Sequence, residues 1–126
     1  QTAVVTASPA ERRLMLLEGA VTWSRSLGEA LDAEDFDGIA ESSSRCRAIL
    51  VALGTDLDTR VHPELAQRLA SLHLWLYQCV VDAKSSIDLG YAVELLEFQR
   101  DAWRDAVEVL RAGDATSPPK TIDLAG

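Results

Sequence analysis

The residues that could support chemistry in this sequence are two histidines, two cysteines and a spread of carboxylates. A di-iron site in a helical bundle needs a Glu three residues before an inward-facing His, and neither His62 nor His73 has one. A phosphotransfer bundle needs an exposed histidine beside basic residues, whereas His73 has leucines on both sides and no lysine nearby. The glycines are isolated, and no phosphate loop, nucleophile elbow or HExxH motif is present. We therefore expect no catalytic residue, no metal site and no cofactor.

The two cysteines, Cys46 and Cys79, lie inside apolar periodic segments, with no CxxC pair. A free thiol in that setting behaves as a small hydrophobic group. This pattern predicts buried, reduced and inert thiols, and it points to the cytoplasm.

Composition excludes several classes of partner. The chain has 126 residues, a formal net charge of −8 and a pI near 4.6, which disfavour nucleic acid and anionic membrane surfaces. No run approaches the roughly 18–20 apolar residues of a membrane span, and no basic-then-apolar leader opens the sequence. We expect a soluble protein that does not insert into membranes.

The elements that must carry any function are helices. Ser8-Pro9-Ala10-Glu11 is a capping box with proline at the first helical position, and it predicts a helix that ends near residues 32–34. Apolar residues at helical spacing predict three more helices, over about 35–57, 63–83 and 88–111, with Gly113 as a C-cap. The fold expected is all-α: an antiparallel up-down four-helix bundle over residues 8–112, with an extended arm at 1–7 and a flexible tail at 113–126.

Two features suggest a binding protein. The segment 63–83 is apolar over most of its circumference, so it is either central or carries a binding face. The arm, residues 1–7, is uncharged and contains the β-branched run Val4-Val5-Thr6, which favours lying along a groove. An equally simple interpretation is that all these side chains fill one core, and the residues alone leave both open.

Four stretches resemble the bacterial flagellar export chaperones of the FliS type. Val5-Thr6-Ala7-Ser8-Pro9, with the Leu14-Met15-Leu16 and Glu18-Gly19-Ala20 that follow, is similar to the family signature V-x-T-A-S-P-x-x-L-x-x-M-L-Y-x-G. The other three are degenerate: Ala48-Ile49-Leu50 with Leu53 and Leu57-Asp58, then Leu72 to Ala83, and finally Phe98 to Trp103. Together they cover about residues 4–104 in the family's order.

The chain departs from that pattern at several positions. Arg12 stands where the family usually has Leu, and Leu17 where it has Tyr. In the third helix the customary tyrosines and basic residues are replaced by His73, Trp75, Gln78 and Cys79. These departures bear on partner contacts and leave the expected fold intact.

The resemblance implies a cytoplasmic, non-enzymatic chaperone. It would bind the disordered C-terminal segment of flagellin, prevent premature polymerisation and deliver the subunit to the flagellar type III export apparatus. Such a segment would lie in an apolar groove and become partly helical. No nucleic acid, small-molecule substrate or cofactor is implied.

Seven residues are the candidates for partner binding. Val4 and Val5 are expected to cover part of the groove in the free protein, and the groove itself is expected on the second and third helices, at Ile39, Ile49, Leu50, Trp75 and Leu76. Three alternatives remain: a chaperone or adaptor for another secreted filament protein, a signalling bundle with a phosphorylatable His73, and an oligomerisation domain.

Overall fold

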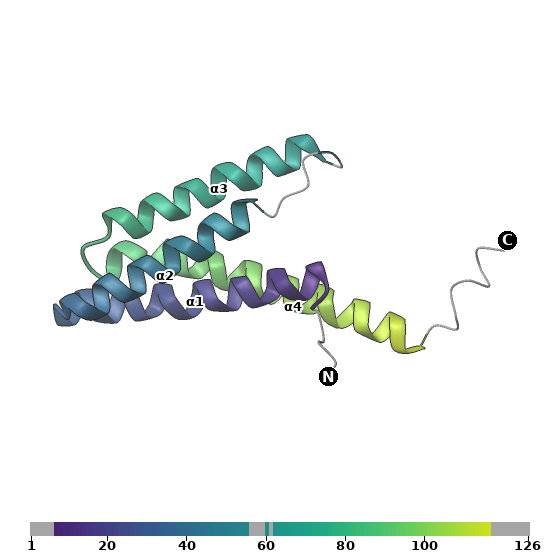
Figure 1. Ribbon diagram of the computed structural model, residues 1–126, viewed down its shortest axis with the longest axis horizontal. Coiled ribbons are helices and arrows are strands. Elements are labelled where there is room, and N and C mark those ends of the chain that lie inside the picture. The colour runs from purple at the N-terminus through teal and green to yellow at the C-terminus, as the bar shows by residue number, and fades with distance from the viewer. Residues whose placement is uncertain (1–6, 56–59, 61, 117–126) are drawn as a thin grey trace, which may run out of the picture.

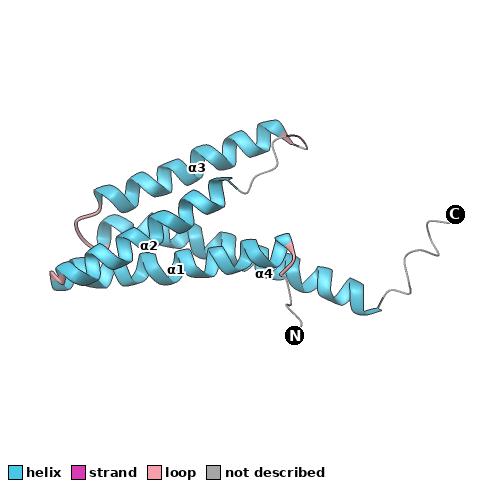
Figure 2. Ribbon diagram, viewed as in Figure 1, coloured by secondary structure: helices cyan, strands magenta, loops and turns pink. Residues whose placement is uncertain are grey.

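The computed structural model of the chain describes residues 7–55, 60 and 62–116, with side chains through Gly113. Four long helices follow one another: α1 (Pro9–Ala33), α2 (Phe36–Thr55), α3 (Pro63–Asp82) and α4 (Gly90–Thr116) (Figure 1). A single 3-10 turn, η1 (Ile87–Leu89), precedes α4. Helices and the turns between them account for the described residues (Figure 2), so the predicted all-α bundle is confirmed.

Helix α1 begins and ends where the sequence predicts. The Ser8 hydroxyl accepts the Glu11 amide at 3.1 Å, and the Glu11 carboxylate accepts the Ser8 amide at the same distance, which completes the capping box. At the other end Glu34 adopts a left-handed conformation, with φ 54°, and its amide bonds back to carbonyls of the last turn. Local residue types therefore fix both ends of the helix.

The helices do not share their contacts evenly. Helix α1 packs along α2 on one side and α4 on the other, while α3 packs mainly on α2. In Figure 1, α3 lies along the upper edge of the bundle, away from α1. The apolar excess of α3 is thus not explained by a central position.

The core runs through all four helices and closes on η1. Its fully buried side chains come from each element and are chiefly leucines: Leu17, Leu27, Leu50, Leu53, Leu76, Leu89 and Leu96. Each such leucine contributes about 1.5–3 kcal/mol by leaving water. This burial holds the bundle together.

The end of α4 differs from the prediction. The helix continues through Gly113 to Thr116, five residues beyond the expected end at Arg111. Gly113 does not adopt a positive φ, so it does not form the C-cap expected from its type. Glycine permits a left-handed cap but does not impose one. The expected helix end at Arg111 was therefore wrong, while the flexibility expected of residues 113–126 stays a prediction.

Within the described residues no helix is both long enough and apolar enough to span a membrane.

Candidate partner-binding surfaces

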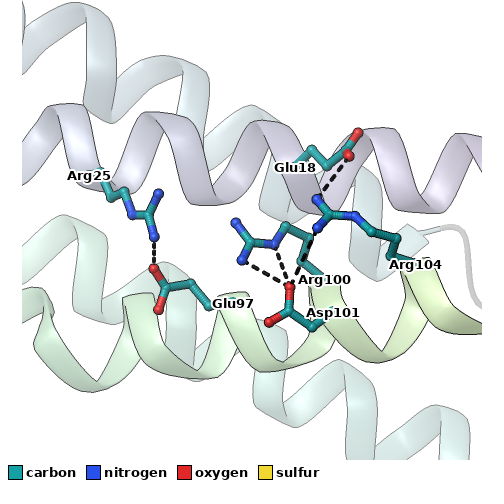
Figure 3. A network of polar contacts seen from close by, with 6 residues as sticks. All are labelled: Glu18, Arg25, Glu97, Arg100, Asp101 and Arg104. Atoms are coloured by element: carbon teal, nitrogen blue, oxygen red, sulfur yellow. Dashed lines mark hydrogen bonds and ion pairs between the residues drawn. The ribbon is translucent and has the colours of Figure 1, made fainter.

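Ion pairs join α1 to α4 along one seam of the bundle. Arg25 of α1 pairs with Glu97 of α4, and farther along Arg104 Nη2 lies 3.4 Å from Glu18 Oε2 (Figure 3). Arg104 also reaches Asp101, whose carboxylate accepts from Arg100 at 2.9 Å. We call this contact the α1–α4 seam. Its polar side chains bond to one another along this contact, which borders a hollow of about 410 Å³ lined by residues that include Met15, Glu18 and Arg104. This side of the bundle therefore also carries a hollow, but one with charged side chains in its lining.

The seam continues to the first turn of α1. Arg111 Nη2 donates to Glu11 Oε2 at 2.7 Å. The hydrogen bond from the Ser8 amide, followed by the one from Arg111, lowers the pKa of Glu11 to about 2. The same carboxylate thus caps α1 and binds α4.

A buried polar cluster lies inside the bundle near this end. The Arg13 guanidinium donates to the Leu53 carbonyl of α2 at 3.2 Å and stacks on the Trp103 ring, 5.7 Å from its centroid. Trp103 in turn donates its indole N–H to the Ala10 carbonyl at 2.8 Å. The Arg13 guanidinium thus joins three helices. Removing its partners would leave a buried charge without compensation, which is costly.

His73 of α3 faces the same cluster. Its side chain is buried, and neither ring nitrogen forms a hydrogen bond among the residues described. Burial, then the positive charge of Arg13, lowers the pKa of His73, and the neighbouring Gln99 side chain opposes that shift. A buried, neutral ring is poorly placed to accept phosphate, which disfavours a phosphotransfer role.

Between α2 and α3 lies a shallow apolar hollow of about 280 Å³, which we call the α2–α3 groove. Its wall and floor are uncharged: Leu50, Val51 and Gly54 from α2, and Ala70, Leu74 and Tyr77 from α3, beside His73. Leu74 is 62% exposed and Val51 is 53% exposed. A Cβ atom added at Gly54 would meet no atom within 4 Å. The α2 backbone at Gly54 is therefore open on this side.

A second hydrophobic surface lies on the opposite flank of α3. It is formed by Trp75 of α3 with Tyr91, Glu94, Leu95 and Phe98 of α4, and we call it the α3–α4 patch. Tyr91 and Phe98 are 82% and 71% exposed. The two surfaces differ in chemistry, because a carboxylate lies within the patch and none within the groove.

The structure places the seven predicted residues differently. Leu50 forms the groove floor and Leu76 is fully buried in the core. Trp75 is half exposed and lies in the α3–α4 patch. Ile39 and Ile49 are partly buried against the core, and Ile49 reaches α1 beside Gly19. Val4 and Val5 lie outside the described residues.

The exposed residues of the groove were not singled out from the sequence. The exposed Val51 and Leu74 and the half-buried Gly54 and Tyr77 lie off the rows of apolar residues spaced four and three apart on their helices, which are Cys46, Leu50 and Leu53 on α2 and Leu69, Leu72 and Leu76 on α3. That is the signal that could have found them. The rows do not decide burial alone, because Leu65, which continues the row on α3, is 53% exposed.

Chemistry other than binding finds little support among these residues. Among the residues described, no group of three or more His, Cys, Asp or Glu side chains is placed to hold a metal ion. Burial raises the pKa of the Cys46 thiol to about 11, and burial followed by the charge of Asp82 raises that of Cys79. Both thiols are therefore weak nucleophiles at neutral pH.

Comparison with known proteins gives the family. Residues 1–109 match the family model described as flagellar protein FliS. The chain belongs to the FliS family. It is also 27% identical over 111 residues to the flagellar secretion chaperone FliS of Bacillus subtilis (strain 168), a match that covers 86% of this chain and 82% of that protein. FliS is a chaperone family of flagellar secretion.

Proposed function

We propose that this FliS-family chain binds the disordered C-terminal segment of flagellin in the cytosol. By covering that segment it prevents premature polymerisation, and it delivers the subunit to the flagellar type III export apparatus. The protein acts by binding and carries out no reaction. The observation that carries the proposal is the α2–α3 groove, with exposed Leu74 and Val51 above a buried floor.

The chemistry of the groove suits such a client. A segment that would otherwise self-associate through its apolar face loses that face to the groove, since every described residue of the lining is uncharged. Removing apolar surface from water contributes roughly 25 cal/mol per Å². Part of this is offset by the entropy lost when the segment becomes ordered, so affinity can remain moderate.

The N-terminal arm is the second part of the proposal. Arg13, near the start of α1, bonds to the Leu53 carbonyl, directly before Gly54 at the groove's end. Six extended residues reach up to about 20 Å. Val4 and Val5 are therefore proposed to compete with the client for this end of the groove. Deleting residues 1–6 then tightens client binding, and an unchanged affinity argues against competition.

Calorimetric titration with the flagellin C-terminal segment of the same organism tests the function. We expect saturable one-to-one binding with a negative heat-capacity change and a gain of helical circular dichroism. Leu74→Ser removes an exposed apolar contact and weakens binding at least fivefold. Gly54→Trp fills the groove with an indole ring and is expected to abolish binding of the flagellin segment.

Two controls make the titration specific. Val109→Ser removes an equally exposed apolar side chain from α4, at a site outside the groove, and leaves affinity within twofold. A wild-type protein that does not bind flagellin but captures another secreted filament subunit would identify that subunit as the client. Equal affinity of the wild-type protein and Gly54→Trp for the flagellin segment would show that the client does not bind in the groove.

A further inference from the structure

The α3–α4 patch has an extent and exposure that the proposed groove does not explain. Leu74 and Trp75 are adjacent in sequence but face opposite flanks of α3, Leu74 the groove and Trp75 the patch. One helix therefore separates the two surfaces, and a residue can be changed in one without touching the other.

The patch continues along α4 as an exposed stripe. Residues three, four and seven apart share a helix face, so Tyr91, Leu95, Phe98 and Ala102 lie in one row on α4, which continues to Val109. Apart from the half-buried Leu95, these side chains are exposed. The row from Tyr91 to Ala102 is roughly 16 Å long at about 1.5 Å per residue, or three turns of a docked helix.

The charged residues on this face are nearly all acidic. Glu94, Asp101 and Asp105 lie on the same face of α4 as the apolar row, and Asp82 lies seven residues from Trp75 on α3. Asp101 pairs with Arg100, but in the described part of the chain Glu94, Asp105 and Asp82 form no ion pair. The one basic side chain on the Trp75 face of α3, Arg68, is bound by Glu64 at 3.0 Å.

This charge decides between possible occupants. A second copy of the chain would place carboxylate against carboxylate, and the chain as a whole carries a net charge of −8. An anionic membrane surface is disfavoured for the same reason. A cationic partner is attracted by the same carboxylates that repel a second copy or an anionic membrane, because opposite charges at the rim of an interface favour association and set specificity.

We propose that the α3–α4 patch docks an amphipathic helix of a second protein that carries lysine or arginine beside its apolar residues. The apolar row receives the apolar face of that helix, and the carboxylates pair with its flanking cations. This site is separate from the groove and does not depend on the client's identity. The protein can then hold its client and this partner together.

A synthetic helical peptide of leucine and lysine, with its leucines on one face, is the probe. A matched peptide with glutamate in place of lysine is the control. Calorimetry is expected to show saturable binding of the lysine peptide that weakens at high salt, and binding of the glutamate peptide at least tenfold weaker. Amide NMR shifts caused by the lysine peptide should centre on Trp75, Tyr91 and Phe98.

Matched variants locate the site. Phe98→Ser is expected to weaken the lysine peptide tenfold or more, while Val51→Ser, an exposed apolar change in the groove, leaves affinity within twofold. Glu94→Lys weakens it at least threefold, and Glu29→Lys, at an exposed carboxylate of α1, does not. All four positions are exposed, so folding is preserved.

Four results would overturn the proposal: absence of saturable binding, equal binding of the two peptides, a larger loss from Val51→Ser than from Phe98→Ser, or competition between the lysine peptide and the flagellin segment. Saturating the protein with the flagellin segment must also leave the affinity for the lysine peptide within twofold, and competition would assign the patch to the client. If flagellin does not bind at all, the proposed function fails. The peptide titration of the free protein still shows whether the α3–α4 patch binds a cationic amphipathic helix.

Discussion

The α1–α4 seam and the α2–α3 groove are both contacts between helices, but they are built from different chemistry. The seam pairs charges across the helices at Arg25–Glu97 and Arg104–Glu18 (Figure 3). A third pair, Arg111–Glu11, lies at the first turn of α1. The groove leaves Val51 and Leu74 largely exposed. The α1–α4 seam thus pairs charges that line its own hollow, whereas the groove has exposed apolar side chains and no charged residue in its described lining.

A small bundle can remain folded while it exposes apolar surface, because separate sets of residues serve the two purposes. The seam, the buried leucines and the Arg13–Trp103 stack maintain the fold. The exposed face of α3 is therefore free to serve binding. Changes on the two sides should have opposite consequences, with stability lost on one and affinity lost on the other.

The largest effect is expected from truncating the same residue type in the core and in the groove. Leu96→Ala removes a fully buried side chain and should lower the free energy of unfolding by about 2–5 kcal/mol. Leu74→Ala removes one that is 62% exposed and should change it by less than about 0.5 kcal/mol. Urea unfolding of both variants measures the difference. Similar losses would show that α3 depends on its outer face for stability.

A glycine pair gives the next largest contrast. At Gly28 an added Cβ would lie 3.1 Å from the Ser86 Cβ and 3.3 Å from its Cα, and the Ser86 amide is fixed by Asp32 at 2.9 Å. Gly28→Val should therefore cost about 1–3 kcal/mol by overpacking. Gly54→Val meets open space and should change stability by less than about 0.5 kcal/mol. Thermal unfolding followed by circular dichroism compares them, and a destabilised Gly54→Val would mean that the groove is closed in solution.

The sequence predicts a structural feature when neighbouring residues cause it, and does not when distant helices do. The capping box at Ser8 and Glu11 was readable because four neighbouring residues form it. The sequence could not show that Trp75 lies on one flank of α3 and Leu74 on the other, because this depends on where α2 and α4 lie. Nor could the sequence show that Leu76 is needed by the core while its neighbour is exposed. The continuation of α4 past Gly113 was missed because glycine only permits a helix to stop.

Acidification tests the buried polar cluster. Burial lowers the pKa of His73 below its ordinary value of 6.5, so the unfolded chain binds a proton there before the folded chain does. Stability is therefore fully present above pH 6.5 and is lost as pH falls from 6.5 toward the lower folded value. His73→Phe should flatten this part of the profile. A wild-type stability that does not change between pH 7 and 5 would contradict a buried, neutral His73.

The smallest effect is expected at the ion pairs of the seam. A double-mutant cycle with Glu18→Gln and Arg104→Met should give a coupling of about 0.2–1 kcal/mol, because both side chains are partly exposed. The coupling should shrink in high salt, and flagellin affinity should not change. A loss of affinity for flagellin would show that the α1–α4 seam contributes to client binding, which contradicts the assignment of binding to the groove alone.

Hydrogen exchange tests the central claim most directly. Amide exchange is followed by mass spectrometry on the full chain, alone and saturated with the flagellin C-terminal segment. We predict slower exchange in peptides that cover Leu50–Gly54 and Ala70–Tyr77, with no change in those that cover the α1–α4 seam. Protection centred on the seam, or protection spread evenly over the four helices, would contradict the account.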